Sequence, residues 1–155
     1  MEVLIRPATT MDIGRLAPLV QGYWEFEAIA GFDRARIETL LRTLLTAPQS
    51  GACWVAESQG RLCGYLLAVF MLSFEHGGLM AEIDELFVSP EMRSSGVGSL
   101  LLARAEGELK QRGLVRLQLQ LGSLNDRAGL FYERHGFRRR AGYALLDKPL
   151  ASPAA

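Results

Sequence analysis

Apolar positions along the chain change between helical and strand-like spacing, and each change marks an expected boundary between elements. An apolar run at residues 3–5 ends at Arg6-Pro7 and predicts a short strand. A helical stripe follows, formed by Ile13, Leu16, Leu19 and Val20. A second helical stripe begins near Asp33 and ends at Pro48. We therefore expect the chain to begin with one strand and two consecutive helices.

Three strands are expected in the middle of the chain. Residues 52–57 and 61–74 are rich in residues typical of strands, and Ser58-Gln59-Gly60 between them suits a hairpin turn. Residues 80–88 form a third run of the same character. Because short turns join neighbouring strands in opposite directions, these three strands predict an antiparallel meander.

Helices alternate with strands in the second half of the chain. A glycine-containing loop after Pro90 leads into a helix that ends near Gly113. Its apolar face consists of Val97, Leu100, Leu101, Ala105 and Leu109. A strand at 115–121, a helix at 127–135 and a strand at 137–146 complete the pattern.

This order of elements predicts the fold class. It reads strand, helix, helix, three strands, helix, strand, helix, strand, which is an α/β (α+β) arrangement with a mixed central sheet. No linker or internal repeat divides the chain. We expect one domain over residues 1–150 and a disordered tail at residues 151–155.

Length and composition fit a packed globular domain. The 155 residues are 49% hydrophobic and 22% charged, which is inconsistent with a disordered chain. The 17 basic residues are balanced by 17 acidic ones. Because phosphate neutralisation supplies most of the affinity for nucleic acid, a chain of zero net charge is not expected to bind nucleic acid.

No segment predicts a membrane span or a secretion signal. The longest apolar stretch, residues 62–74, is shorter than the roughly 20 residues that a membrane helix needs. The N-terminus has no basic region ahead of an apolar core. We therefore expect a cytoplasmic protein in which Cys53 and Cys63 are packed thiols. The alternative is a disulfide between them, which their neighbouring predicted strands would allow. No cluster resembles a zinc site, so no metal is expected.

One stretch is suited to binding phosphate. Arg93-Ser94-Ser95-Gly96-Val97-Gly98 lies between an expected strand and an expected helix. Backbone N–H groups at a helix N-terminus lack partners within the helix and lie at the positive end of its dipole, so they attract anions. The two glycines alone are equally consistent with a glycine-rich helix entry, since neither the dinucleotide fingerprint nor the nucleotide P-loop is complete.

A second segment places this stretch in a family context: Asn125-Asp126-Arg127-Ala128-Gly129-Leu130-Phe131-Tyr132-Glu133-Arg134-His135-Gly136-Phe137. Together the two segments resemble the GCN5-related N-acetyltransferase (GNAT) superfamily, in which the first grips the pyrophosphate of acetyl-CoA and the second is a helix near the thioester. The order of elements also resembles the acyl-CoA N-acyltransferase fold. The resemblance covers nearly the whole chain, and it implies a V-shaped splay between the strands ending at Val88 and Leu121. Ser94 departs from the glycine common in the family.

The resemblance implies a binding site for acetyl-CoA as co-substrate, with no metal. The backbone of Leu86, Phe87 and Val88 would pair with the pantetheine arm like an added strand. Asn125 resembles a family asparagine that contacts the cofactor, and Tyr132 would contact the cofactor as well. The pyrophosphate would be held by Arg93, Ser94, Ser95, Gly96, Val97, Gly98 and Ser99.

The resemblance also implies that Tyr132 is the general acid. Attack of an amine on the thioester expels a thiolate, and a free thiol has a pKa near ~8.5 against ~10 for a phenol. A nearby O–H can therefore stabilise or protonate the leaving sulfur. The alternative is that Tyr132 only packs against Phe131 on a short helix. A backbone N–H on the strand at 80–88 is expected to stabilise the oxyanion.

Three carboxylates, Glu82, Asp84 and Glu85, are candidates for the base, because a protonated amine with a pKa near ~10 must lose a proton before it attacks. Strand alternation puts Glu82 and Asp84 on the face of Leu86 and Val88, and Glu85 on the face of Ile83 and Phe87. The sequence does not choose between them. Solvated charges at a strand end, with water carrying the proton, are the alternative.

The acceptor is expected to bind near residues 22–32, the region between the first two helices that shapes the acceptor pocket in this family. Trp24, Glu25 and Glu27 are the candidate residues there, although core packing would also explain the aromatic side chains. We expect direct transfer in a ternary complex to a small cationic amine. The alternatives are a protein lysine or N-terminal acetyltransferase, a non-catalytic acyl-CoA sensor and a purely structural module. A homodimer is compatible with the neutral, apolar-rich composition.

Overall fold

The computed structural model of the chain describes residues 2–151. It contains two compact units, which divide between Gln120 and Leu121. The expectation of one domain over residues 1–150 stays a prediction, and the expected disordered tail at 151–155 lies outside the described residues except for its first position. None of the helices formed by residues 2–151 is long and apolar enough to cross a membrane.

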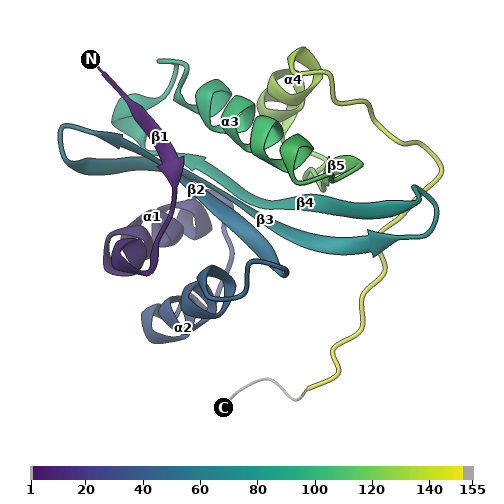
Figure 1. The fold of residues 1–155 in the computed structure, drawn as a ribbon, viewed down its shortest axis with the longest axis horizontal. Coiled ribbons are helices and arrows are strands. Elements are labelled where there is room, and N and C mark those ends of the chain that lie inside the picture. The colour runs from purple at the N-terminus through teal and green to yellow at the C-terminus, as the bar shows by residue number, and fades with distance from the viewer. Residues whose placement is uncertain (1, 152–155) are drawn as a thin grey trace. The chain divides into compact units, whose positions relative to one another are not determined.

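A five-stranded mixed sheet forms the centre of the first unit (Figure 1). Its strands are β1 (Leu4–Pro7), β2 (Gly51–Ser58), β3 (Arg61–Ser73), β4 (Gly78–Val88) and β5 (Arg116–Leu119), in that spatial order. The first four run antiparallel to their neighbours, and β5 runs parallel to β4. The predicted mixed sheet and its antiparallel meander are therefore confirmed.

Helices cover both faces of this sheet. The helices α1 (Ile13–Phe26) and α2 (Arg34–Leu45) lie on one face, and α3 (Val97–Gln111) lies on the other (Figure 1). Asp33 begins α2 as predicted, because its side chain accepts a hydrogen bond from the Arg36 N–H and so caps the helix. The two short 3₁₀ turns are η1 (Thr10–Asp12) and η2 (Pro90–Met92).

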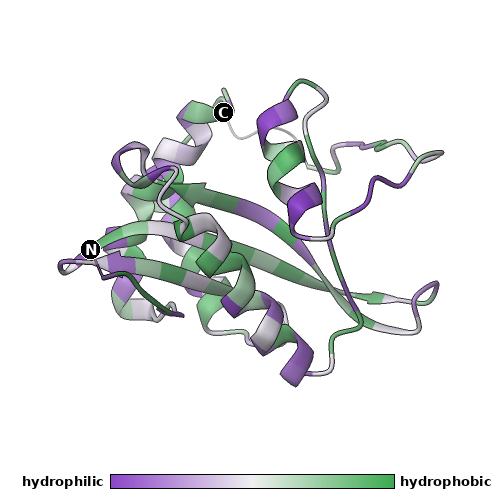
Figure 2. Ribbon diagram, turned by 90° about the horizontal axis from the view of Figure 1, so that it is seen from above, coloured by the Kyte–Doolittle hydropathy of each residue, from purple (hydrophilic) through white to green (hydrophobic). Residues whose placement is uncertain are grey.

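Successive side chains of β2 point to opposite faces of the sheet and therefore pack in both layers of the core. Cys53 and Val55 pack with α1 and α2, whereas the Trp54 indole N–H donates to Glu108 of α3 at 2.8 Å. Apolar residues are concentrated on these central strands (Figure 2). Leu16, Leu66 and Leu101 have no exposed surface. Burial of each such side chain stabilises the fold by about 1.5–3 kcal/mol.

The first hairpin has the turn that its sequence predicts. Gln59 and Gly60 have φ values of 50° and 74° between the paired residues Ser58 and Arg61. Two consecutive residues with positive φ match the right-handed twist of the flanking strands. The glycine relieves the steric cost of this conformation at the second of the two positions.

One residue of β4 lies outside the regular ladder. Glu85 is opposite Leu67 on β3, and Ile83 is opposite Ala68, so Asp84 forms a β-bulge. Glu82 is opposite Val69, and Leu67 and Val69 are two residues apart on one face of β3. Glu82 and Glu85 therefore share a face. The predicted alternation, which separated them, was wrong because a bulge resets the period-2 pattern.

The second unit contains the helix α4 (Asp126–Arg134), as the sequence predicted. The strand expected at 137–146 is absent, and no residue from 135 to 151 is in a helix or strand. A strand exists only where another strand pairs with it, and the described strands offer none to this segment. Gly142 adopts a φ of 86°, which also interrupts an extended run. The strand prediction was therefore wrong.

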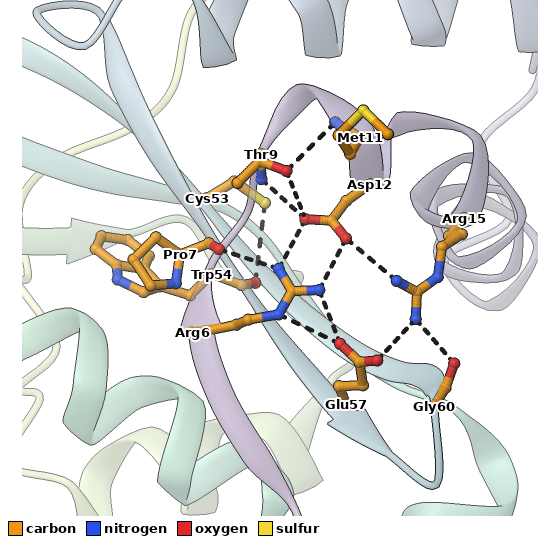
Figure 3. Close-up of polar contacts among 10 residues, drawn as sticks. All are labelled: Arg6, Pro7, Thr9, Met11, Asp12, Arg15, Cys53, Trp54, Glu57 and Gly60. Carbon is orange, nitrogen blue, oxygen red and sulfur yellow. Dashed lines mark hydrogen bonds and ion pairs between the residues drawn. The ribbon is translucent and has the colours of Figure 1, made fainter.

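An ion-pair network joins β1, α1 and β2 (Figure 3). The guanidinium of Arg6 donates to both oxygens of Asp12 at 2.8 and 2.9 Å and to Glu57 at 2.8 Å. Arg15 reaches both carboxylates and the carbonyl of Gly60. The Asp12 side chain is only 3% exposed, and hydrogen bonding to Arg6 lowers its pKa to about 2. Because leaving a buried carboxylate without its partner is costly, this network bears on the stability of the fold.

The substitution Asp12→Asn is expected to lower the free energy of unfolding by about 3 kcal/mol, because it removes one partner of a buried ion pair. The folded pKa of about 2 lies below the reference value of 3.8, so this stabilisation is complete above about pH 4 and is lost as the pH falls through about 2. Urea unfolding across this pH range measures it.

Asp33→Asn is the matched control. Asp33 is exposed at the start of α2, and asparagine caps a helix nearly as well as aspartate. A change below about 0.5 kcal/mol is expected for this variant. Equal losses in both variants would contradict the importance of the Asp12 network.

Candidate functional site

The segment between β4 and α3 forms the first part of the candidate site. Its backbone twice enters the left-handed region, at Ser94 with a φ of 62° and at Gly96 with a φ of 87°. Ser94 adopts this conformation despite its side chain, at the position where the family has glycine. Ser95 donates its hydroxyl to the carbonyl of Met92, which closes the loop.

The start of α3 is suited to a diphosphate. Gly96 is the N-cap, no side chain caps the helix there, and a Cβ at Gly96 would meet nothing within 4 Å. The N–H groups of Val97, Gly98 and Ser99 thus lie at the end of a 15-residue helix, next to open space. Val97 itself is buried, so only its backbone can contact a ligand. These residues fit the phosphate-binding role of acetyl-CoA recognition.

The second part is the end of β4. Pairing with β5 stops at Ile83 and Leu119, although β4 continues to Val88. The stretch of β4 that contains Leu86, Phe87 and Val88 therefore has no strand on its β5 side among residues 2–151. An open strand edge offers backbone donors and acceptors that an extended ligand can pair with.

Arg93 already uses one of these backbone groups. Its Nε donates to the carbonyl of Val88 at 3.1 Å, and its guanidinium lies 4.7 Å from the ring centre of Phe26 and 5.4 Å from that of Phe87. The arginine is thus held at the junction of α1, β4 and the loop that leads into α3. Its remaining N–H groups stay available to an anion.

Glu85 is the most restrained of the three candidate carboxylates. One oxygen accepts from the Tyr65 hydroxyl at 2.8 Å, and the other accepts from the Trp24 indole N–H at 3.0 Å. Burial raises the pKa of Glu85, while these two hydrogen bonds oppose the increase. The donors come from β3 and α1, so the carboxylate lies on the face covered by α1 and α2.

Glu82 lies two residues before Asp84, which forms the bulge. Glu82 is half-buried and accepts from the Gln118 amide of β5 at 3.0 Å. Asp84 is exposed as a whole residue. Partial burial of its carboxyl group, together with the charge of Glu82, raises the pKa of Asp84. None of Glu82, Asp84 and Glu85 forms an ion pair with a cationic side chain of the described residues.

The candidate acceptor residues belong to the last turns of α1. Trp24 contacts Glu85 and packs edge-on against Phe32, with ring centres 5.9 Å apart. Glu25 is exposed and accepts from Gln21, and Glu27 is exposed at the C-cap. The structure therefore brings Trp24 to Glu85. Glu25 and Glu27 form no side-chain hydrogen bond with β4 among the contacts of residues 2–151.

Two candidate residues lie in the second unit. Asn125 begins α4, where its side-chain oxygen accepts from the Ala128 N–H at 3.2 Å. Tyr132 is half-buried on α4, and its ring packs edge-on against Phe131 and Phe137 at centroid distances of 5.2 and 5.4 Å. The asparagine is thus a helix cap, a role that the sequence analysis did not assign.

Sequence reasoning missed Tyr65 and Gln118, the neutral partners of the carboxylates. A signal existed for Tyr65, because a tyrosine within a fully apolar strand usually has a hydrogen-bond partner for its hydroxyl. The described residues hold no group of three or more side chains suited to binding a metal ion. Cys53 and Cys63 are buried free thiols, as predicted, and burial raises the pKa of Cys53 to about 12.

Comparison with known sequences identifies related proteins. The sequence model of the acetyltransferase (GNAT) family matches residues 16–137. The uncharacterized N-acetyltransferase YhfO of Bacillus subtilis is 31% identical over 139 residues, covering 90% of this chain and 92% of that protein. The aminoalkylphosphonate N-acetyltransferase of Salmonella typhimurium is 33% identical over 85 residues, 55% of each chain. The spermidine N(1)-acetyltransferase of Thermoplasma acidophilum is 23% identical over 145 residues, 89% of each.

Solved structures share the fold. An integron cassette protein from the mobile metagenome of Cole Harbour Salt Marsh superposes with a TM-score of 0.83 at 27% identity, covering 96% of this chain and 91% of that one. An aminoglycoside N-acetyltransferase in complex with CoA superposes with a TM-score of 0.83 at 17% identity, covering 95% of each chain. At that identity the second likeness concerns the fold alone.

Proposed function

Because the chain belongs to the acetyltransferase (GNAT) family and is therefore an acetyl-CoA-dependent N-acetyltransferase, we propose that its acceptor is a small cationic amine. Transfer occurs by direct attack in a ternary complex. The observation that carries this proposal is the group of half-buried and exposed β4 carboxylates, Glu82, Asp84 and Glu85, for which the described residues supply no cationic partner. A cationic substrate would supply the missing positive charge.

Acetyl-CoA is the acetyl donor, and the start of α3 supports its proposed position. The N–H groups from Ser94 to Ser99, with Arg93, bind the diphosphate at the positive end of the α3 dipole. The pantetheine arm extends along Leu86, Phe87 and Val88, which follow the last residue of β4 that pairs with β5. The slot proposed from the splay of β4 and β5 begins where their pairing ends at Ile83 and Leu119. Asn125 remains a proposed cofactor contact.

The reaction forms a C–N bond and breaks a C–S bond, while one proton leaves the amine and one reaches the sulfur. The neutral amine nitrogen attacks the thioester carbon, and a backbone N–H of β4 near the Asp84 bulge stabilises the oxyanion. The tetrahedral intermediate collapses with cleavage of the C–S bond, and the proton of Tyr132 goes to the leaving sulfur. A carboxylate on β4, directly or through water, takes the proton from the amine nitrogen. The products are the N-acetyl amine and CoA with a free thiol.

The names of two related proteins support a small amine as the acceptor. The relatives from Salmonella typhimurium and Thermoplasma acidophilum are named for aminoalkylphosphonate and for spermidine. Both compounds are small amines, which supports a low-molecular-weight acceptor for this chain. Trp24 is the proposed acceptor contact closest to the carboxylates, because it donates to Glu85, and Glu25 and Glu27 remain candidates at the end of α1.

A panel of acceptors tests the proposal. The protein is incubated with acetyl-CoA and either 1,4-diaminobutane, an aminoalkylphosphonate, an aminoglycoside, a lysine peptide or a peptide with a free N-terminus, and thiol release is followed. We expect the highest kcat/KM for a small amine. A preference for either peptide would favour a protein acetyltransferase, and acetyl-CoA binding without turnover would favour a sensor; either result would overturn the proposal.

A further inference from the structure

Two neutral donors hold the carboxylate of Glu85 from opposite elements. The Tyr65 hydroxyl of β3 donates to one oxygen at 2.8 Å, and the Trp24 indole of α1 donates to the other at 3.0 Å. Each oxygen therefore has a separate partner, and neither partner neutralises its charge. The result is a carboxylate fixed in orientation and still able to attract a cation.

Packing fixes the donors themselves. Tyr65 has no exposed surface, and its ring lies 6.4 Å from that of Phe87. A Cβ at Gly22 would come within 3.0 Å of the Phe87 ring, so glycine at this position lets α1 approach β4 closely. Trp24 follows two residues later on the same helix and is packed against Phe32. Glu85 is therefore bound by side chains that cannot move without disturbing the core.

None of the groups that shift the pKa of Glu85 is a cation. Asp84 of β4 raises its pKa, and the charge of Glu85 in turn raises the pKa of Cys53 on β2 and of Tyr65. Burial raises the pKa of Tyr65 far above its ordinary value, so its hydroxyl remains a donor at all physiological pH values. On α1, Tyr23 raises the pKa of Tyr65 further. Arg93 lies over Phe87, and its hydrogen bond goes to the backbone of Val88.

We propose that Tyr65 and Trp24 are positioning residues that orient Glu85 to bind a second, non-reacting ammonium group of the acceptor. The substrate class is therefore an amine with two cationic centres. This inference rests on the proposed function. A base has to accept a proton, and the two hydrogen bonds that Glu85 accepts stabilise its charged form and so oppose protonation. An anchor has only to remain charged and fixed.

The β4 bulge places a second carboxylate, that of Glu82, on the same face of the sheet as Glu85. Glu82 and Glu85 are opposite residues two apart on β3, which corresponds to about 7 Å along the strand. A short alkyl diamine can span this separation. Glu82, which accepts a hydrogen bond from Gln118, is left to receive the proton of the reacting amine.

Two amines of equal carbon number test the anchor. Kinetic constants are measured for 1,4-diaminobutane, which carries a second ammonium, and for butylamine, which does not. Tyr65→Phe and Trp24→Phe each remove one hydrogen bond to Glu85 and keep an aromatic ring. We expect each to raise KM for 1,4-diaminobutane roughly tenfold, with a smaller change in kcat, and to raise KM for butylamine by a clearly smaller factor. The acid limb of kcat/KM for 1,4-diaminobutane should also move to higher pH, because loss of a hydrogen bond raises the pKa of Glu85.

Trp54→Phe is the matched control. Trp54 is buried and its indole donates to Glu108, so this variant loses an equivalent bond on the other face of the sheet. This variant should leave the ratio of kcat/KM for 1,4-diaminobutane to kcat/KM for butylamine unchanged. Equal losses of kcat/KM for both amines in Tyr65→Phe and Trp24→Phe would overturn the proposal that Glu85 binds the second ammonium, and would leave these residues a structural role. If Tyr65→Phe fails to fold, the result for Trp24→Phe decides. Wild-type enzyme that acetylates neither amine would instead count against the proposed function.

Discussion

Tyr132→Phe is expected to lower kcat by about 100-fold or more, the usual contribution of a positioned general acid. The substitution removes only the phenolic O–H, and the ring that packs against Phe131 and Phe137 is retained. The leaving CoA sulfur would then depart as an unprotonated thiolate. Single-turnover kinetics with saturating acetyl-CoA measure the chemical step, and calorimetry should give an unchanged Kd for acetyl-CoA.

Tyr143→Phe is the control for this variant. Tyr143 is exposed, and its hydroxyl accepts a hydrogen bond from Arg140 at 3.0 Å. Loss of this second phenol should leave turnover unchanged. Normal turnover in Tyr132→Phe would remove the tyrosine from the mechanism and assign the proton of the leaving group to water.

Gly96→Glu is expected to weaken binding of acetyl-CoA by about 100-fold or more, because a carboxylate next to a bound diphosphate costs several kcal/mol. The N-cap of α3 has open space for a side chain, so the effect should arise from charge rather than from a clash. Titration calorimetry with acetyl-CoA gives the affinity, and a thermal melt shows whether the variant is folded.

Two variants separate charge from backbone strain. Gly96→Ala introduces a Cβ at a φ of 87° without a charge, and Gly113→Glu introduces the same carboxylate at a φ of 82° near the other end of α3. Both should bind acetyl-CoA nearly normally, at a cost in stability of about 1–2 kcal/mol. If Gly96→Glu bound acetyl-CoA as the wild type does, the diphosphate would have to lie elsewhere.

Most elements were predictable because their causes are local. The helical stripe that begins at Ile13, the cap at Asp33 and the turn at Gln59-Gly60 all depend on residues within a few positions. The conformation of the loop proposed to bind phosphate is local as well, since a strand, a proline turn and a glycine at the N-cap lie within one short segment. The structure agrees with the sequence at each of these positions.

The predictions that were wrong depend on pairing between strands that are distant along the chain. The expected strand at 137–146 has apolar positions, but no described strand pairs with it. The faces of Glu82 and Glu85 were assigned by simple alternation, and the bulge at Asp84 reversed that assignment. A bulge is defined by the register of two strands, so one strand examined alone does not reveal it.

The sequence by itself determined the family, the order of the first nine elements and the loop suited to a diphosphate, because backbone conformation and helix capping follow from neighbouring residues. Only the tertiary structure decided which carboxylates share a face and which side chains hold them. Tyr65 lies 20 residues from Glu85 along the chain, and Trp24 lies 61 residues away. Their hydrogen bonds exist because antiparallel pairing and the close approach of α1 bring three separate elements to one point.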